Sequence, residues 1–579
     1  MMNKNYPIYK TTFIDDMRSL VEESAQNFPD SIAISYKENY WDKEVRKVTF
    51  SQWRDDVRNL GTALISYGFR EENIAILGEN TYGWCCAFFA VMATGSVTVP
   101  VDKELPIEDI DGIITTTGTK VLIYGKSSES KVKEILRNGG LKSVELIISV
   151  ASSNSIEASE LGGRTLKTLE EVQAEGAGLY ASGDNSYYDY KIDVNKLASI
   201  VFTSGTTGKG KGVMLSQANI ALDMTLGMYN FDITRKTLHV LPPHHTFGST
   251  VNYVGHLSQG CEVYISSGIK HVSDEIKEQQ PTHLILVPAF LEVMNRKIWA
   301  TARKDGKEGL LKAMIKVSNF LRKFGVDVRR KLFASVLSAF GGKLELIICG
   351  GAKLDEEIIR NFDALGITIL NGYGITECAP LISANRNKYQ KPGSVGTPIL
   401  ACRVKIDNPD ENGEGEICVK GPNVMLGYYN NPEATAEVFD KDGFFHTGDY
   451  GKLDEEGWIY ITGRKKNLII LSNGKNVYPE EIEADLQKVE GVSEVVVYAG
   501  ESRVQKDKIT IVAEIFPDAD LLAHKGISNA QEYFENQVKA LNAKMPPYKA
   551  VKCVKLRNVE FEKNTSRKIT RFSIDKSID

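Results

Sequence analysis

The sequence predicts a mixed α/β protein with a large N-terminal domain, residues 1–462, and a small α+β C-terminal domain, residues 463–579. Three observations support this. Strand-like and helix-like segments alternate between residues 73 and 124, short strands with glycine turns follow residue 392, and a compact α+β pattern begins near residue 463. Such alternation is typical of mostly parallel sheets with right-handed crossovers, and 579 residues exceed the size of one core.

The composition is that of an ordinary globular protein, with 42% hydrophobic and 25% charged residues. A net charge of −5 excludes a generally basic nucleic-acid binder. The eight cysteines are scattered without C-x-x-C spacing, which favours buried thiols over disulfides or zinc. The first residues are polar and lack a signal-peptide apolar core, so we expect a cytoplasmic location.

The N-terminal part is expected to begin with helices over residues 14–28 and 50–67. The alternating segments that follow are a strand at 73–77, a helix at 84–93, a strand at 97–101, a helix at 107–116 and a strand at 120–124. The uncharged run 84–101 is about long enough to cross a bilayer, but its change of character favours a buried helix–turn–strand unit. Residues 150–195, polar and dotted with glycine and serine, are predicted to be a loop-rich connection.

A polar tract between two short apolar strands, at 199–202 and 213–215, is the first sign of a nucleotide site. Its residues are Thr203, Ser204, Gly205, Thr206, Thr207, Gly208, Lys209, Gly210, Lys211 and Gly212. Hydroxyls, ammonium groups and bare backbone N–H groups at this density favour a polyphosphate ligand. The tract differs from the ATPase P-loop, because Gly212 replaces the metal-binding hydroxyl and a strand, not a helix, follows.

Three later strands also deliver polar loops at their carboxyl ends, where α/β sheets bind ligands. A strand ending at residue 241 precedes Pro242, Pro243, His244 and His245; the alternative for these histidines is a structural role. A strand at 346–349 precedes Gly350, Gly351, Ala352 and Lys353. A strand at 367–370 precedes Asn371, Gly372, Tyr373, Gly374, Ile375, Thr376 and Glu377, where an aromatic ring, a hydroxyl and a carboxylate suit adenine, phosphate and Mg²⁺.

These motifs, in this order, resemble those of the adenylate-forming superfamily, which includes acyl-CoA synthetases, luciferases and peptide-synthetase adenylation domains. The polar tract resembles the family's T-S-G-T-T-G-x-P-K-G-V, with Gly210 in place of proline and Lys211 as the family's lysine. The resemblance covers residues 14–571. It is strongest to the long-chain fatty-acid–CoA ligase branch, because a long basic insertion occurs here.

The resemblance implies a role for each motif. Tyr373 would stack on adenine, Thr376 would bond the α-phosphate and Glu377 would hold Mg²⁺. His245 would orient the carboxylate substrate, with His244 the weaker candidate. The complete implied cofactor-binding set is Thr203, Ser204, Gly205, Thr206, Thr207, Gly208, Lys211, Gly351, Ala352, Asn371, Gly372, Tyr373, Gly374, Thr376, Asp449, Arg464 and Gly474.

The C-terminal part of the resemblance implies a mobile domain. Asp449 and Arg464 would bind the ribose, Lys466 would be the hinge, and Gly474 would border the pantetheine tunnel. Residues 564–571 resemble the family's T-S/T-G-K-I-x-R, with Arg567 in place of glycine. Lys568 matches the lysine that reaches into the adenylation site, and with His245, Thr376 and Glu377 it completes the implied catalytic set.

The implied reaction has two halves and uses ATP, Mg²⁺ and coenzyme A. A carboxylate attacks the α-phosphorus of ATP, giving an acyl-adenylate and pyrophosphate, and the thiol of coenzyme A then displaces AMP. The basic insertion and aliphatic segments favour a medium- or long-chain fatty acid. The alternatives are acyl transfer to a carrier protein, activation of an aryl or amino acid, and a non-catalytic nucleotide-binding protein.

The basic insertion spans residues 296–331, where lysines and arginines far outnumber acids. Its apolar residues recur at helical spacing, which predicts an amphipathic helix: Leu310, Met314, Val317, Leu321 and Phe324. One interpretation is a solvated helix packed on the domain, and the other is a patch that contacts the anionic inner face of a membrane. The sequence does not indicate an oligomeric state.

Overall fold

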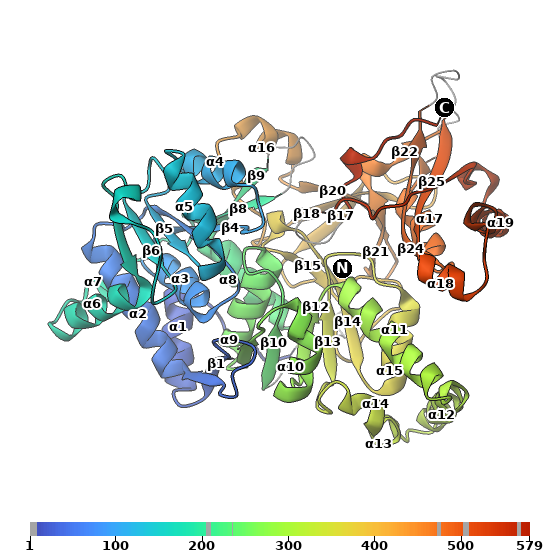
Figure 1. Ribbon diagram of the computed structural model, residues 1–579, viewed down its shortest axis with the longest axis horizontal. Coiled ribbons are helices and arrows are strands. Elements are labelled where there is room, and N and C mark those ends of the chain that lie inside the picture. The colour runs from blue at the N-terminus through green and yellow to red at the C-terminus, as the bar shows by residue number, and fades with distance from the viewer. Residues whose placement is uncertain are drawn as a thin grey trace. The chain divides into compact units, whose positions relative to one another are not determined.

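The computed structural model of the chain describes residues 9–203, 210–233, 235–471, 476–501, 509–563 and 569–578. The chain has the mixed α/β fold that the sequence predicts (Figure 1). Its internal contacts divide it into two compact units. The first contains residues 1–403 and 420–443, and the second contains residues 404–419 and 444–579.

The first unit contains an eight-stranded sheet, and its strands β3 to β7 are blue and cyan in Figure 1. Five neighbouring pairs, from β8 to β7, are parallel, and β9 and β19 add antiparallel strands at the other edge. The spatial order is β19 (Gly427–Tyr428), β9 (Lys211–Ser216), β8 (Leu197–Thr203), β4 (Val97–Val101), β3 (Asn73–Leu77), β5 (Val121–Tyr124), β6 (Leu146–Ser149) and β7 (Thr165–Thr168). The predicted parallel sheet is therefore confirmed.

The uncharged run at 84–101 is a buried helix followed by a buried strand. Helix α3 (Tyr82–Ala93) is buried along nearly its whole length, and β4 follows it in the middle of the sheet. Among the described residues, no helix is both long enough and apolar enough to traverse a bilayer. The eight cysteines, which are all described, form no disulfide, and seven of them are buried, as predicted.

The prediction of a loop-rich connection over 150–195 is wrong. This segment contains β7, α6 (Leu169–Ala181) and α7 (Ser186–Asp189). Helix α6 packs tightly on α2 (Phe50–Ser66), and a Cβ added to Gly176 would lie only 1.8 Å from the Asn59 carbonyl oxygen. Glycine is needed here for close helix packing rather than for a turn.

A nine-stranded sheet completes the first unit. From β14 to β1 its neighbours are parallel, and antiparallel strands lie at both edges. Its order is β16 (Thr397–Pro398), β15 (Leu381–Ala384), β14 (Thr368–Gly374), β13 (Leu346–Cys349), β12 (His283–Leu286), β10 (Lys236–His239), β11 (Glu262–Ile265), β1 (Ile32–Tyr36) and β2 (Arg46–Thr49). We expected β14 to end at residue 370, but it continues to Gly374 because its last residues pair with β15.

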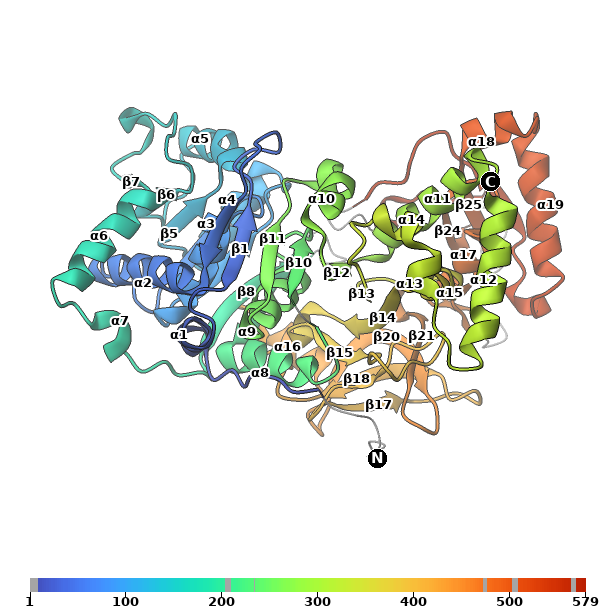
Figure 2. The ribbon, with the colours of Figure 1, turned by 90° about the horizontal axis from the view of Figure 1, so that it is seen from below.

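Helices flank both sheets (Figures 1 and 2). Besides those named above, they are α1 (Met17–Asn27), α4 (Ile107–Thr117), α5 (Glu129–Arg137), α8 (Gln217–Met228), α9 (His256–Ser258), α10 (Val272–Gln279), α11 (Pro288–Lys304), α12 (Glu308–Arg322), α13 (Arg329–Leu332), α14 (Ala334–Ser338), α15 (Glu356–Leu365) and α16 (Pro432–Val438). The predicted amphipathic helix is α12, but the predicted apolar stripe faces the core only in part, through Met314. Leu310, Val317 and Phe324 are exposed, whereas Leu311 and Ser318 are buried.

The second unit has a four-stranded and a three-stranded sheet. The first contains β17 (Arg403–Asp407), β18 (Gly415–Lys420), β20 (Phe445–Leu453) and β21 (Ile459–Arg464); the second contains β24 (Val492–Gly500), β25 (Thr510–Pro517) and β26 (Cys553–Leu556). A short hairpin, β22 (Ile469–Ile470) and β23 (Asn476–Val477), and the helices α17 (Pro479–Leu486), α18 (Ala519–His524) and α19 (Ala530–Asn542) complete it. Contacts thus group the four-stranded sheet with the C-terminal residues. The boundary at 462/463, as the limit of a moving domain, stays a prediction.

Candidate active site

Loops at the carboxyl ends of the parallel strands in the nine-stranded sheet form the first part of the site. Because β10, β12, β13 and β14 are parallel neighbours, their carboxyl ends lie side by side. A Cβ added to Gly350 would lie 3.4 Å from the Phe247 ring and 3.5 Å from the Gly372 carbonyl oxygen. The loops that follow β10 and β13 therefore meet the end of β14, as predicted from the positions of the motifs.

The end of β14 offers an acceptor suited to an amino group of a bound base. Asn371 is 7% exposed, and among the described residues its side-chain oxygen Oδ1 has no hydrogen-bond partner. Its carbonyl, in contrast, accepts bonds from the backbone and the side chain of Asn385. A buried acceptor without a donor is costly, so the exocyclic amine of adenine fits this position.

Gly351 and Tyr373 also lie at the carboxyl ends of these strands, Gly351 after β13 and Tyr373 near the end of β14. Gly351 has a left-handed backbone conformation with φ of 87°, which glycine adopts without strain. Tyr373 lies in β14 opposite Ser383 and is only 6% exposed. Stacking of Tyr373 on adenine stays a prediction.

A second part of the site joins the two sheets of the first unit. The hydroxyl of Tyr428 in β19 donates to Glu377 Oε1 at 3.0 Å. The Lys211 ammonium lies over the Tyr428 ring, 4.7 Å from its centroid. Lys211 begins β9 and Glu377 lies in the 3-10 turn η5 (Thr376–Cys378) after β14, so Tyr428 links the predicted phosphate and metal residues.

Tyr428 was missed as a functional residue by the sequence analysis. It lies within a glycine–tyrosine–tyrosine run, where its pairing with Val213 could not be foreseen. Burial and the Glu377 carboxylate raise the pKa of its hydroxyl well above the ordinary value, so it stays protonated and keeps donating. No local motif marks Tyr428, because it reaches the site through the pairing of β19 with β9.

A buried hydrogen-bond network holds the turn that carries Glu377. Asp223, in α8, accepts bonds from the Leu381 N–H and from the Asn423 amide. Asn423 also donates to the carbonyls of Cys378 and Leu381. Burial raises the pKa of Asp223 well above its ordinary range. The turn is therefore fixed from both sides by side chains distant in sequence.

The histidine turn lies after β10. His244 is buried, and its Nε2 lies 3.4 Å from an Asp102 carboxylate oxygen, without hydrogen-bond geometry. Burial lowers the pKa of His244. The His245 ring is 4.3 Å from that of His244 and is less buried, and its carbonyl accepts bonds from Gly248 and Ser249. His244 thus has a structural place, and a substrate role for His245 stays a prediction.

The second unit carries the predicted ribose pair. Asp449 and Arg464 are opposite each other in β20 and β21, with Arg464 Nε 2.8 Å from Asp449 Oδ1. Asp449 is almost fully buried, whereas the Arg464 side chain is 49% exposed. The structure thus brings these two together. Lys466 lies just beyond, exposed in the 3-10 turn η6 (Lys465–Asn467), and its role as a hinge stays a prediction.

Some predicted site residues lie outside the described residues. These are Ser204, Gly205, Thr206, Thr207, Gly208, Gly474 and Lys568. The strands on either side of the polar tract are described: β8 and β9 pair in antiparallel fashion, with Thr203 opposite Lys211. The predicted strands on the two sides of the polar tract are therefore confirmed, and the second of them distinguishes the tract from a P-loop, which a helix follows.

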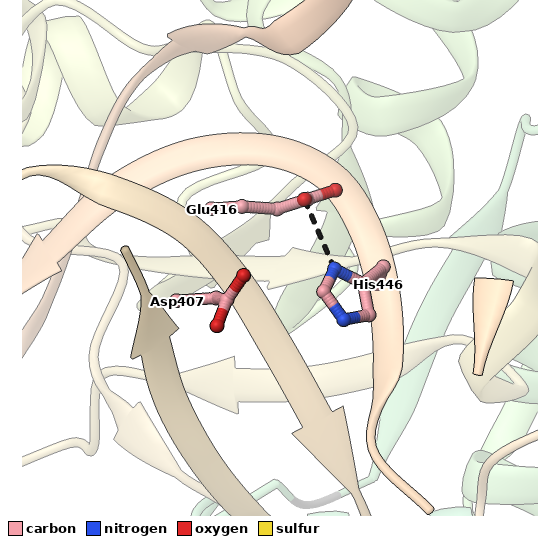
Figure 3. A group of neighbouring side chains, drawn as sticks. All are labelled: Asp407, Glu416 and His446. Carbon is pink, nitrogen blue, oxygen red and sulfur yellow. Dashed lines mark hydrogen bonds and ion pairs between the residues drawn. The ribbon is translucent and has the colours of Figure 1, made fainter. Parts of the chain in front are cut away.

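A cluster of three metal-binding residue types occurs in the second unit (Figure 3). Asp407, Glu416 and His446 come from neighbouring strands, and their ligand atoms lie within 4.8 Å of one another. Glu416 Oε2 bonds His446 Nδ1 at 3.0 Å and also the Lys465 ammonium at 2.6 Å. Burial opposes ionisation of Glu416, but these two partners outweigh it and lower its pKa. An ammonium already neutralises the buried carboxylate, so the cluster is an ion-pair network.

The fold and the loops at the strand ends define an adenylate-forming enzyme, and comparison with known proteins agrees. The family model described as "AMP-binding enzyme" matches residues 21–429. The chain is 30% identical to long-chain-fatty-acid–CoA ligase 1 of Cavia porcellus, over 83% of this chain and 71% of the relative. It is 27% identical to the long-chain-fatty-acid–[acyl-carrier-protein] ligase AEE15, chloroplastic, of Arabidopsis thaliana, over 83% and 74% of the two chains.

Solved structures share the fold. The adenylation domain of a carboxylate reductase from Mycobacterium chelonae has a TM-score of 0.78 and 20% identity, covering 96% of this chain and 89% of that one. ATP-bound MatB from Rhodopseudomonas palustris has a TM-score of 0.71 and 22% identity, covering 96% and 97%. The chain belongs to the AMP-binding enzyme family. Enzymes of this family activate acids as acyl-adenylates and use ATP, Mg²⁺ and coenzyme A, which confirms the predicted cofactors at the level of the family.

Proposed function

We propose that the chain is a fatty acyl-CoA synthetase, which converts a medium- or long-chain fatty acid to its acyl-adenylate and then to its coenzyme A thioester. The observation that carries adenylation is the convergence of Lys211, Glu377 and Tyr428 within the first unit. A cation and a metal-binding carboxylate at one place suit a triphosphate. The names of the curated relatives support the fatty-acid substrate.

The residues of the chain would divide the work of the first half-reaction. Lys211 and the hydroxyls and N–H groups of the polar tract would hold the phosphates, and Thr376 would bond the α-phosphate. Bound Mg²⁺, held by Glu377, would neutralise phosphate charge. Lys568 would stabilise the negative charge that develops when the carboxylate attacks phosphorus. No nucleophilic side chain is needed, because positioning and charge stabilisation suffice.

The second half-reaction would use the C-terminal residues differently. Rotation about Lys466 would withdraw Lys568 and bring Gly474 to the thiol of coenzyme A, as the family resemblance implies. The domain that moves would then be residues 463–579. Cytoplasmic coenzyme A would be the acceptor.

The test is a pyrophosphate-release assay with acids of increasing chain length, benzoate and amino acids, each with and without coenzyme A. We expect release that depends on a fatty acid of eight or more carbons and AMP formation that rises with coenzyme A. Glu377→Gln serves as the inactive control. Release with no acid in the panel, or with aryl or amino acids alone, would contradict the proposal.

A carrier protein is a second candidate acceptor, because one relative in the comparison is a ligase for acyl-carrier protein. The same assay discriminates the two when coenzyme A is replaced by a phosphopantetheinylated carrier protein. Turnover with the carrier alone would assign the acceptor to it.

A further inference from the structure

Helix α12 has an exposed apolar face, which we call the α12 outer face. It consists of Leu310, Val317, Phe320, Phe324 and Val326, which are 58%, 57%, 59%, 70% and 48% exposed. Leu310 and Val317 are seven residues apart and share one side of α12, whereas Phe324 and Val326 follow the end of the helix at Arg322. The rings of Phe320 and Phe324 contact each other with centroids 5.1 Å apart. Two exposed phenylalanines in contact at the end of a helix form an apolar patch, and such patches often mark interaction sites.

The α12 outer face is not needed to hold the helix on the protein. Leu311 and Ser318, which directly follow Leu310 and Val317 in the sequence, are buried, and Met314 and Ile315 pack against the core of the nine-stranded sheet. The helix also contacts α11 and α15, and Figure 1 shows these helices together beside β12 to β14. The side chains of the outer face are therefore left to the solvent.

Basic side chains surround this face. Arg303, Lys304, Lys307, Lys316 and Lys323 are all exposed. Three acidic side chains of the region are engaged, because Glu308 pairs with Lys312, Asp327 with Arg329 and Asp363 with Arg322, each at 2.7 Å; Asp305 is an exposed acid among the lysines. The surface that meets solvent around the apolar face is therefore positively charged.

A hollow beside the helix extends this basic region. It is open, measures about 460 Å³ and is lined by Asn319, Arg322, Lys323, Arg360 and Asp363. Two of its three cationic side chains already have acidic partners, because Arg322 pairs with Asp363 at 2.7 Å and Arg360 pairs with Glu356 at 3.3 Å. Asn319, which lines the hollow, directly precedes Phe320 in α12.

We propose that the α12 outer face docks on a membrane surface that contains anionic lipid, with the two phenylalanines among the acyl chains near the headgroups and the lysines against phosphates. An interfacial helix has this combination of an apolar side and flanking cations. A second copy of the chain is a poorer occupant, because pairing of two such faces would bring their lysines together.

The test is flotation of the full chain with vesicles of phosphatidylcholine alone or with 30% phosphatidylglycerol. We expect binding to the anionic vesicles, weakened by high salt because the lysines act through charge. The double variant Phe320→Ser/Phe324→Ser should lower the partition coefficient at least about tenfold, and Lys316→Glu/Lys323→Glu should do the same. These side chains are exposed, so the fold should be retained, as checked by thermal unfolding.

Matched controls are changes of equally exposed residues elsewhere on the first unit. Trp41→Ser removes a 78% exposed aromatic residue, and Lys142→Glu reverses an exposed lysine; both should bind vesicles like the parent. Equal binding of the parent and the α12 variants, or absence of binding to anionic vesicles, would overturn the proposal. A concentration-dependent dimer that Phe320→Ser/Phe324→Ser abolishes would assign the face to a second copy instead. None of these readouts depends on the substrate of the enzyme.

Discussion

Glu377, the expected Mg²⁺ ligand, is held by contacts that come from far along the chain. Its carboxylate accepts a bond from Tyr428, and its carbonyl accepts the Met425 N–H at 2.8 Å. The same tyrosine ring carries the Lys211 ammonium. A side chain fixed at both its backbone and its carboxylate is preorganised for a metal, which reduces the cost of assembling the site.

Tyr428→Phe tests this arrangement at the level of one hydroxyl. The variant keeps the ring under Lys211 but removes the bond to Glu377, and a hydrogen bond to a charged group contributes about 1.5–3 kcal/mol. We expect pyrophosphate release at limiting Mg²⁺ to fall at least about tenfold, with much of the loss recovered at high Mg²⁺. Unchanged dependence on Mg²⁺ would show that Tyr428 does not position the carboxylate.

Buried histidines in the core of the first unit predict sensitivity to acid. Burial lowers the pKa of His239 to about 3 and that of His256 to about 4, below the ordinary 6.5. The unfolded chain therefore binds more protons than the folded chain between pH 6.5 and about 4. The stabilisation is complete above pH 6.5 and is lost as the pH falls, by up to about 1.4 kcal/mol per pH unit for each histidine.

The apparent Tm of the full chain, measured between pH 7 and pH 4, checks this. We expect it to fall with decreasing pH, and we expect the fall to be shallower in His256→Gln, whose amide can still bond the Val251 and Asn252 carbonyls that Nδ1 contacts. If the Tm of the parent and the Tm of His256→Gln fell equally with pH, protonation of His256 would not explain the loss of stability in acid.

At the scale of elements, the turn η5 depends on α8 and on the segment before β19. Asp223→Ala would leave the Leu381 N–H and the Asn423 amide without their acceptor, which costs about 1–3 kcal/mol. Asp223→Asn, the isostere of the neutral acid, is the matched control and should cost less. We expect Asp223→Ala to lower both the Tm and the rate of pyrophosphate release, measured at saturating ATP.

If Asp223→Ala lowers the Tm but leaves the rate of pyrophosphate release unchanged, the hydrogen bonds of Asp223 do not contribute to the active site. In that case Asp223 would support only the packing of α8. Recovery of both quantities in Asp223→Asn would instead show that hydrogen bonding, rather than negative charge, fixes the turn.

Elements whose residues contact near neighbours in the sequence were predictable. The strands at 73–77 and 97–101 have the predicted bounds because continuous apolar runs mark buried parallel strands. Helix α6 and the end of β14 were not predictable, because both depend on partners elsewhere: α6 on close packing with α2, and β14 on pairing with β15. In both elements the sequence interprets glycines as turn residues, whereas in the structure these glycines allow a neighbouring segment of backbone to approach closely.

The same contrast applies to the α12 outer face and to Tyr428. Helical spacing identified the apolar residues of α12, but a helix with two apolar sides does not reveal which one faces the core. Tyr428 enters the site through a two-residue strand that pairs with β9, more than two hundred residues away in the sequence. Local motifs in the sequence propose site residues, whereas a residue that long-range strand pairing brings beside them, such as Tyr428, carries no such motif.

At the scale of the whole molecule, the proposed mechanism assigns the two half-reactions to different arrangements of the C-terminal residues. The structure supplies two compact units, and the four-stranded sheet with Asp449 and Arg464 belongs to the second of them. If the moving part is residues 463–579, then the hinge would lie within the second unit, with Asp449 before it and Lys568 after it. A crosslink between cysteines introduced on either side of residue 466 would report this movement.

The most direct test of the account measures the two half-reactions of Lys568→Ala separately. Acyl-adenylate formation is followed from palmitate and MgATP, and thioester formation from preformed palmitoyl-AMP and coenzyme A. We expect the first rate to fall by a factor of about a thousand or more, as for the loss of a group that stabilises developing charge, and the second to stay within a few-fold of the parent. Equal loss in both halves, or no loss in the first, would contradict the account.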